Sequence, residues 1–211
     1  MDEKACLLCG GIAELFFTDA PKKYYRCKEC LGIFLDPACR LSKEKEHARY
    51  LEHNNDVEDP AYQKFVDPIV SEIRQRFGRA HQGLDYGAGP GPVIAKLLRD
   101  EGYAIELYDP FFWNDRQKLE GKYDFIACCE VIEHFHAPAK EFKQLRSLLK
   151  PGGALFCMTE LYSEAVNFKT WYYRNDPTHV FFFHRKTLER IRSDFDFYDL
   201  KTKGRLVQFA I

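Results

Sequence analysis

The chain has 211 residues, of which 45% are hydrophobic and 30% are charged, and its net charge is −1. This length accommodates one catalytic domain and a small additional module, and the composition is that of a globular protein. No apolar run reaches the about 18 residues of a membrane-spanning helix, and the acidic, cysteine-containing N-terminus does not resemble a signal peptide. We therefore expect a cytoplasmic protein with no membrane partner. The even charge distribution argues against a basic nucleic-acid-binding surface.

Two cysteine pairs lie near the N-terminus. Each pair has the spacing Cys-x2-Cys, and a short intervening segment separates them; the four residues are Cys6, Cys9, Cys27 and Cys30. This pattern is typical of a closed, structural Zn²⁺ site with four thiolate ligands. Two redox-active pairs or four unrelated thiols are the alternatives. Because a segment this short forms too small a core to fold alone, the pattern predicts a zinc ribbon over residues 1–40.

Residues 41–81 are predicted to be a helical connector, with helices over 42–52 and 60–78. The second helix carries apolar residues at every fourth position, at Phe65, Ile69, Ile73 and Phe77. This segment is expected to cover the sheet of the next domain or to form a lid over its pocket. Tyr50, His53 and Tyr62 are candidates to face a ligand, and exposed surface positions are the alternative for each.

Residues 82–211 alternate between apolar runs of strand length and helical patterns, which predicts an α/β sheet. The expected strands cover 82–86, 104–109, 123–128, 153–159, 195–200 and 205–211. The expected helices cover 92–101, 138–149 and 185–194. Cys128 and Cys157 lie within apolar runs and are expected to be buried packing residues.

A glycine-rich loop follows the first of these strands, in the sequence LDYGAGPGP over 84–92. Pro92 removes an amide that a pyrophosphate would need, and Asp85 would repel a phosphate but attract a cation. S-Adenosylmethionine is cationic and carries no phosphate. Asp109 ends the second strand, where it is placed to accept hydrogen bonds from ribose hydroxyls. The alternative is a structural turn without a ligand. The expected cofactor-binding residues are Asp85, Gly87, Ala88, Gly89, Gly91, Asp109 and Pro110.

These motifs resemble those of class I S-adenosylmethionine-dependent methyltransferases. Four motifs of that family are matched in order, by the sequences LDYGAGPG, LYDP, YDFI with EVIEH, and LKPGG. The resemblance implies a Rossmann-like sheet of order 3-2-1-4-5-7-6 with an antiparallel last strand. The stretch between Asp109 and Asp124 is too short for a standard helix and a strand, so the third strand is expected to be reduced. Phe111, Phe112 or Trp113 would then stack on adenine. Residues 1–40 are similar to the zinc domain that precedes the catalytic domain in bacterial sugar C-methyltransferases.

The E-x-x-E-H run after the fourth strand resembles that of ubiquinone-pathway O-methyltransferases and small-RNA 2′-O-methyltransferases. In both, this run and a later histidine can bind a divalent metal. The resemblance implies a site for Mg²⁺, Mn²⁺ or a second Zn²⁺ formed by Glu130, Glu133, His134 and His179, with His184 as an alternative to His179. Catalysis by His134 or His179 as a general base without metal, with Glu133 beside them, is the second interpretation. A structural role is the third.

Aromatic residues gather in the segment 160–184, a common place for substrate-binding insertions. Phe181 and Phe183 are expected in the core, whereas Trp171 and Tyr172 are candidates for either core or pocket. The predicted function is methyl transfer from S-adenosylmethionine to a small-molecule or sugar-type acceptor, at oxygen. The alternatives are an RNA methyltransferase that contacts RNA through the zinc ribbon, and a non-catalytic interaction protein. The sequence leaves the acceptor and the oligomeric state open.

Overall fold

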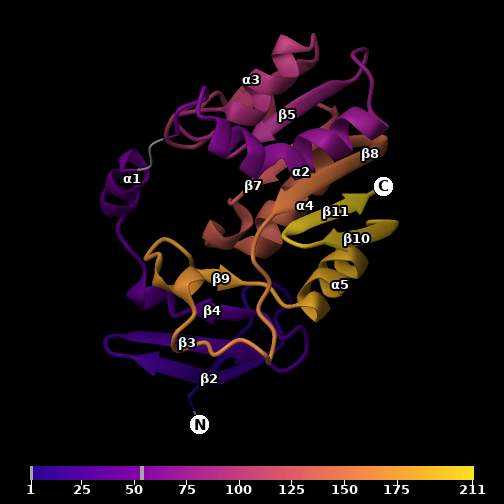
Figure 1. The fold of residues 1–211 in the computed structure, drawn as a ribbon. Coiled ribbons are helices and arrows are strands. Elements are labelled where there is room, and N and C mark those ends of the chain that lie inside the picture. Colours follow the sequence, from indigo (N-terminus) through magenta and orange to yellow (C-terminus); the bar gives the residue numbers. More distant parts are fainter. Residues whose placement is uncertain (1, 53–54) are drawn as a thin grey trace.

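The computed structural model describes residues 2–52 and 55–211 and contains two β-sheets, one above the other in Figure 1. His53, one of the residues predicted to face a ligand, lies outside the described residues. Among the helices described, none has the length and apolar character needed to cross a membrane.

The small sheet is antiparallel and has the order β1-β2-β3-β4-β9. Its first four strands come from the N-terminus: β1 (Glu3–Ala5), β2 (Ile12–Asp19), β3 (Lys22–Cys27) and β4 (Ile33–Leu35). A short helical turn, η1 (Pro37–Cys39), follows. The fifth strand, β9 (Phe181–Phe182), comes from the predicted substrate-binding insertion and pairs with β4. The small sheet is therefore completed by a segment from the distant C-terminal part of the chain.

The large sheet has the order β10-β11-β8-β7-β5-β6. Its strands are β5 (Gln82–Tyr86), β6 (Ala104–Tyr108), β7 (Tyr123–Cys129), β8 (Leu149–Met158), β10 (Asp199–Lys203) and β11 (Leu206–Ala210). β5 to β8 run parallel, whereas β11 is antiparallel to both neighbours. This is the expected strand order without its third strand. Within the described residues, a bridge between Asp109 and Trp113 and the turn η2 (Arg116–Leu119) occupy that stretch of chain.

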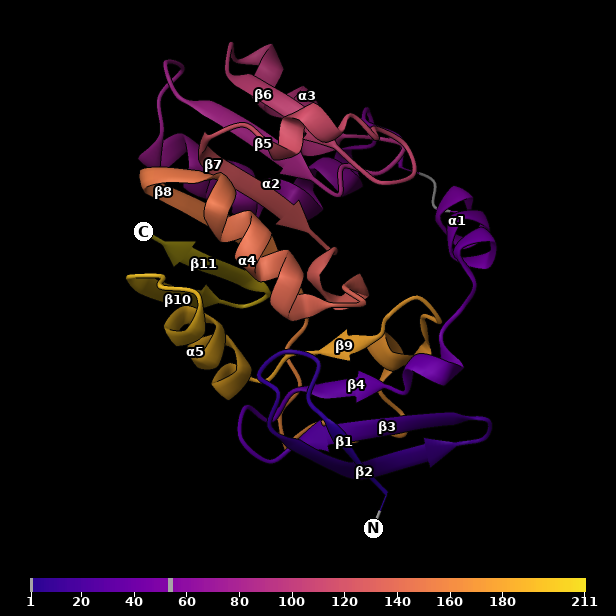
Figure 2. The same ribbon diagram turned by 180° about the vertical axis from the view of Figure 1, so that it is seen from behind.

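Helices cover both faces of the large sheet (Figure 2). One face packs against α2 (Pro60–Arg76) and α3 (Val93–Asp100), and the other against α4 (Pro138–Leu148) and α5 (Arg185–Asp194). Successive side chains of a strand point to opposite faces. Phe125 therefore packs in the core beneath α2 and α3, and Ile126 packs in the core beneath α4 and α5. The helix α1 (Lys43–Leu51) stands apart in Figure 1 and has no buried residue.

Two expectations are refined by the packing. The strand expected over 195–200 begins at Asp199, because Phe195 caps α5 and Asp196 adopts a left-handed conformation (φ 55°). The small sheet shares a hydrophobic core with the large domain, since Cys30 and Phe34 pack in the same cluster as residues of α4 and α5. Its stability therefore does not depend on its own few residues alone.

Candidate functional site

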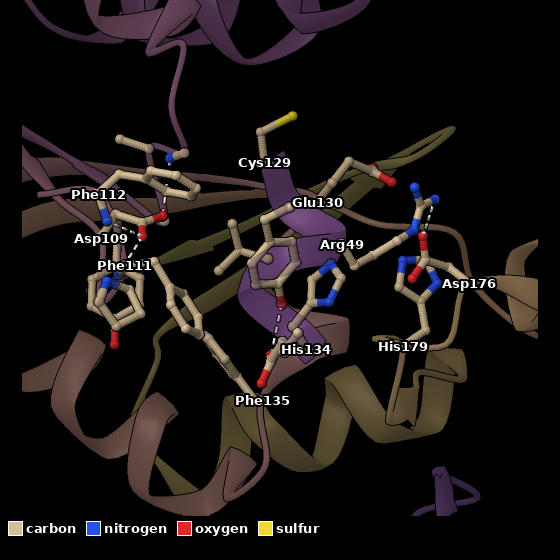
Figure 3. Close-up of a pocket in the computed structure, with 18 of the residues that line it drawn as sticks. Arg49, Asp109, Phe111, Phe112, Cys129, Glu130, His134, Phe135, Asp176 and His179 are labelled. Carbon is tan, nitrogen blue, oxygen red and sulfur yellow. Dashed lines mark hydrogen bonds and ion pairs between the residues drawn. The ribbon is translucent and has the colours of Figure 1, made fainter. Parts of the chain in front are cut away.

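A cavity of about 1070 Å³ lies at the carboxyl ends of β5, β6 and β7, the usual ligand position in α/β sheets. Two further elements close it, α1 and the segment before β9. Figure 3 shows Asp109, Phe111 and Phe112 at one side and Arg49, Asp176 and His179 at the other, with Glu130 and His134 between them. The cavity therefore has two ends with different chemistry.

The glycine loop (residues 87–91) forms the first end. The amides of Gly87 and Ala88 donate to the carbonyl oxygen of Tyr108, at 2.8 and 3.2 Å. Gly87 has φ +77°, and a Cβ there would lie 2.5 Å from Val131. A side chain at this position is thus excluded both by backbone conformation and by space. Gly87, Ala88 and Gly89 all line the cavity.

Two of the predicted cofactor-binding residues do not line the cavity. A Cβ on Gly91 would lie 1.8 Å from the carbonyl oxygen of Asn55, so this glycine permits close packing of the chain after α1. Asp85 is 4% exposed and accepts a hydrogen bond from the amide of Ala95 in α3 at 3.3 Å. Burial raises the pKa of Asp85 to about 7. Asp85 supports the junction between loop and helix, and direct contact with a ligand stays a prediction.

Asp109 organises the loop as well as lining the cavity with Pro110. Its Oδ2 accepts from the amide of Gly89 at 3.0 Å, and its Oδ1 accepts from the amides of Phe111 and Phe112 at 2.8 and 3.1 Å. The indole of Trp113 donates to the carbonyl oxygen of Gly89 at 2.8 Å. Both polar backbone groups of Gly89 are therefore fixed by the chain that follows β6.

The three aromatic residues predicted to stack on adenine have different positions. Phe111 and Phe112 line the cavity, whereas Trp113 is 41% exposed and is not part of its wall. One face of Phe111 is covered by His47 of α1, with ring centroids 5.2 Å apart and an interplanar angle of 7°. Tyr50, a predicted ligand-facing residue, lines the cavity and packs edge-on against Phe111. His47 carries no signal of its own in the sequence.

Glu133, His134 and His179 form a cluster, the acid–imidazole cluster, at the second end of the cavity. One potential ligand atom of each lies within 4.8 Å of the others. Glu133 is fully buried; one of its oxygens accepts a hydrogen bond from the Tyr173 hydroxyl, and Oε2 has no hydrogen-bond partner among the described residues. Burial, followed by the nearby charge of Glu130, raises the pKa of Glu133 to about 8.

Backbone carbonyls orient both imidazoles. Nδ1 of His134 donates to the carbonyl oxygen of Thr178 at 3.0 Å, and Nδ1 of His179 donates to that of Tyr173 at 2.7 Å. Because a carbonyl oxygen only accepts, each neutral ring carries its hydrogen on Nδ1 and its lone pair on Nε2. Nε2 of His179 lies 4.0 Å from Glu133 Oε1. A carboxylate with two such imidazoles fits a divalent metal ion.

Glu130, the fourth predicted ligand, lies outside this cluster. Its Oε2 pairs with Arg205 and lies 3.3 Å from the Tyr173 hydroxyl, and burial raises the pKa of Glu130 to about 7. Arg205 lies on the turn between β10 and β11, so its proximity to Glu130 has no local signal in the sequence. The reserve ligand His184 instead caps α5, where it accepts from the amide of Lys186. Three of the four predicted ligands are therefore brought together.

The aromatic residues of the segment before β9 divide between core and cavity. Phe181 and Phe183 are fully buried, as expected, and Trp171 is also buried. Tyr172 lines the cavity although it is 60% exposed, and Tyr173 lines it while nearly buried. These observations place Trp171 with the core and Tyr172 with the pocket. Tyr62 and Phe65 of α2 also contribute to the cavity wall.

The four N-terminal cysteines converge at one point. Their sulfur atoms lie within 4.8 Å of one another, with Cys6–Cys30 at 3.7 Å and Cys9–Cys27 at 3.5 Å. A tetrahedral zinc site with Zn–S bonds of about 2.3 Å has sulfur separations of about 3.8 Å. The amides of Glu29 and Cys30 donate to the sulfur of Cys27, which stabilises a thiolate. This donor set fits a four-thiolate Zn²⁺ site.

Comparison with known sequences gives one family and several relatives. The family described as "Methyltransferase domain" matches residues 44–202. A ubiquinone biosynthesis O-methyltransferase of Pseudomonas aeruginosa (strain LESB58) is 29% identical over 91 residues, which cover 43% of this chain and 39% of the relative. The corresponding protein of Erwinia tasmaniensis is 32% identical over 91 residues, covering 43% and 37%. The match thus spans about two fifths of the length of these relatives.

Comparison with solved structures identifies the same fold. The 1,6-didemethyltoxoflavin-N1-methyltransferase of Burkholderia thailandensis, solved with 1,6-didemethyltoxoflavin and S-adenosylhomocysteine, has a TM-score of 0.53 at 17% identity and covers 94% of this chain and 98% of its own. An O-methyltransferase family protein from the same organism has a TM-score of 0.53 at 16% identity and covers 78% and 61%. At these identities the likeness establishes the α/β fold.

Proposed function

This chain belongs to the methyltransferase-domain family, and we propose that it is an S-adenosylmethionine-dependent methyltransferase that methylates a hydroxyl group of a small-molecule acceptor. The observation that supports this proposal is a single cavity with two chemical ends. The glycine loop and Asp109 line one end, and His134 and His179 line the other. Both reactants would therefore be held in one cavity.

At the first end, the loop amides and Asp109 would hold the cofactor, with Asp109 facing the ribose hydroxyls. The methyl group would then move by in-line displacement. The bond from sulfur to methyl breaks as the bond from acceptor oxygen to methyl forms, and the hydroxyl proton leaves to a base. Holding two reactants in line supplies much of the rate enhancement in such a transfer.

At the second end, we propose that the acid–imidazole cluster holds a divalent cation, Mg²⁺, Mn²⁺ or a second Zn²⁺. Oε2 of Glu133, which is buried and has no hydrogen-bond partner among the described residues, supports this assignment, because a cation there would favour the ionised carboxylate that burial alone disfavours. A bound ion would lower the pKa of the acceptor hydroxyl. In the tautomer that these carbonyl contacts favour, Nε2 of His134 and of His179 would be the atom that binds the metal or accepts the acceptor proton.

We further propose that Cys6, Cys9, Cys27 and Cys30 bind one structural Zn²⁺. The convergence of their sulfur atoms and the two amide hydrogen bonds to Cys27 support this site. All four positions are occupied by cysteine, which is the arrangement of a closed site without an open coordination position. The zinc would stabilise the small sheet and take no part in methyl transfer.

The acceptor proposal is tested with methyl-labelled S-adenosylmethionine and two fractions of a cell extract, one of low-molecular-weight compounds and one of purified RNA. We expect label in the low-molecular-weight fraction, in an ether or methoxy group identified by mass spectrometry. Transfer to RNA alone, or to nitrogen or carbon of a small molecule, would contradict the proposal. Asp109→Asn is the control variant, because it alters the cofactor end and leaves the acid–imidazole cluster intact.

A further inference from the structure

We propose that the small sheet positions the acid–imidazole cluster, so that a change beside the second cysteine pair is transmitted to the two imidazoles and not to the glycine loop. The inference rests on the proposed role of this cluster at the acceptor end of the cavity. It assigns the N-terminal residues a part in forming the site, beyond their expected role as a separately folded module.

The first step is the pairing of β4 with β9. Ile33 is opposite Phe182, and Phe34 is opposite Phe181. The rings of Phe34 and Phe181 are parallel to within 10° at 6.4 Å, and both are fully buried. Because β9 has only two residues, it lacks the length to form a stable strand by itself, and its position depends on β4.

The second step is the residue that precedes β9. The carbonyl oxygen of Val180 accepts from the amide of Leu35 at 2.9 Å, and the amide of Val180 donates to the carbonyl oxygen of Glu133 at 2.9 Å. Val180 is therefore bonded to the small sheet through one backbone group and to the acid–imidazole cluster through the other. Its neighbour is His179, and the carbonyl oxygen of Thr178 orients His134.

The third step connects β4 to the second cysteine pair. Gly32 lies between Cys30 and β4, and a Cβ on it would meet Cζ of Phe181 at 2.6 Å. The carbonyl oxygen of Cys30 also accepts a buried hydrogen bond from the hydroxyl of Thr187 at 2.8 Å. Thr187 lies in the first turn of α5, shortly after β9. The segment from Cys30 to Gly32 thus contacts both β9 itself and the first turn of the helix that follows it.

The hydrogen bonds that hold the glycine loop come from the large sheet. The glycine loop is held by the carbonyl oxygen of Tyr108, the last residue of β6, and by Asp109, which follows β6. β5 pairs with β6 and β7, and these strands belong to the large sheet. A displacement of β9 should therefore alter the imidazoles while cofactor binding is retained.

The test is Gly32→Ala in the full-length protein, labelled with ¹⁵N-histidine. Long-range ¹H–¹⁵N spectra report the tautomer of each ring, and His134→Gln and His179→Gln assign the two signals. We expect Gly32→Ala to shift both signals or to remove their Nδ1–H pattern, because the added methyl displaces Phe181. The signal of His81, which bonds within its own loop at Gly78, should not move. Zinc content should stay at that of the unmodified protein.

S-Adenosylhomocysteine affinity, measured by calorimetry, should remain within twofold. The double variant Gly32→Ala/Phe181→Leu removes the ring atoms that the methyl would meet and should restore both imidazole signals. If folded Gly32→Ala leaves both signals unchanged, or if the double variant fails to restore them, the proposal is wrong. An equal loss of cofactor affinity would also overturn it.

If Gly32→Ala does not fold, Ile33→Ala, which removes most of the β4 side chain opposite Phe182, is expected to shift the two imidazole signals in the same way. The histidine spectra need neither an acceptor nor activity. A failure of the proposed function would instead appear as an absence of hydroxyl methylation by the unmodified protein, and the two failures are therefore distinguishable.

Discussion

The backbone carbonyl oxygen of Tyr173 accepts a hydrogen bond from Nδ1 of His179 at 2.7 Å, while the rings of the two residues lie 4.2 Å apart. The hydroxyl of the same tyrosine donates to Glu133. One residue therefore fixes the tautomer of an imidazole and partners a buried carboxylate beside it. Contacts within the protein therefore hold this end of the cavity, and its chemistry can be tested one side chain at a time.

Glu133→Gln should weaken Mn²⁺ binding at least tenfold, because it removes the negative charge of the acid–imidazole cluster and preserves its shape. Calorimetric titration of the zinc-loaded protein with Mn²⁺ measures this, and S-adenosylhomocysteine affinity should not change. Glu141→Gln is the matched control, since Glu141 lines the same cavity but bonds to Tyr86. Equal Mn²⁺ binding by Glu133→Gln would exclude the metal assignment and leave the general-base interpretation.

Cys27→Ser should reduce zinc from one ion per chain to nearly none and should lower the melting temperature. A serine hydroxyl is a poor Zn²⁺ ligand, and the small sheet would lose its cross-link. Elemental analysis after gel filtration measures the zinc content. Cys39→Ser is the control, because Cys39 lies outside the group of four cysteines and bonds only weakly to the carbonyl oxygen of Pro21. Full zinc content in Cys27→Ser would refute the ligand assignment.

Asp109→Asn should weaken S-adenosylhomocysteine binding by about 10- to 100-fold. The carboxylate accepts three backbone amides, and charge-assisted bonds are stronger than neutral ones. An asparagine can reproduce only part of this pattern, so the loop would also lose order. Asp115→Asn, which changes an exposed acid a few residues further on, should bind normally. Unchanged affinity in Asp109→Asn would show that the carboxylate is dispensable.

Trp113→Phe should weaken cofactor binding about fivefold, although Trp113 is outside the cavity wall. It removes the indole hydrogen bond to Gly89, and one such bond contributes about 1 kcal/mol. Trp171→Phe provides the comparison, because Trp171 donates to Glu160 away from the glycine loop. Calorimetry with S-adenosylhomocysteine should separate the two variants, and equal affinities would contradict the role assigned to Trp113.

Asp85→Asn should stabilise the protein at pH 8, by about 1–3 kcal/mol. Burial raises the pKa of Asp85 from 3.8 to about 7, so between these values the native chain keeps a proton that the unfolded chain has released. The free energy of unfolding therefore falls as the pH rises across that window. At about 1.4 kcal/mol per pKa unit, the ionised and buried carboxylate of Asp85 costs ~4 kcal/mol of stability at pH 8. The asparagine removes this cost, but its own unpaired, buried amide costs about 1–3 kcal/mol, and the net gain is the difference.

Urea unfolding at pH 5 and pH 8 measures this effect, and the gain should be smaller at pH 5. Asp124→Asn is expected to have the opposite sign. The pKa of Asp124 is lowered by its hydrogen bonds with Lys150 and with the amide of Gln82, against the effect of its burial. Its carboxylate therefore stabilises the fold at pH 8. If both variants stabilised the protein at pH 8, removal of any acidic side chain would have that effect, and the explanation from the burial of Asp85 would be wrong.

The sequence by itself determined the features whose residues are close together along the chain. The glycine loop, the two cysteine pairs and the helix α5 are each encoded by local spacing or periodicity, and α5 has the predicted bounds of 185–194. The prediction that the third strand is reduced also came from a local feature, the short stretch between Asp109 and Asp124. The sheet order was predicted only through the resemblance of these local motifs to those of a known family.

Only the tertiary structure decided which distant groups meet at the site. β9 is two residues long and has no periodic pattern, so nothing local indicates that it completes a sheet begun at the N-terminus. Glu130 belongs to a motif of apparent metal ligands, yet Arg205, 75 positions later, partners it instead. Asp85 belongs to a cofactor motif but lies beneath the loop. In each case tertiary packing determines which groups lie next to the residue. The role of a carboxylate depends on the charges that the fold brings beside it, and local sequence does not show them.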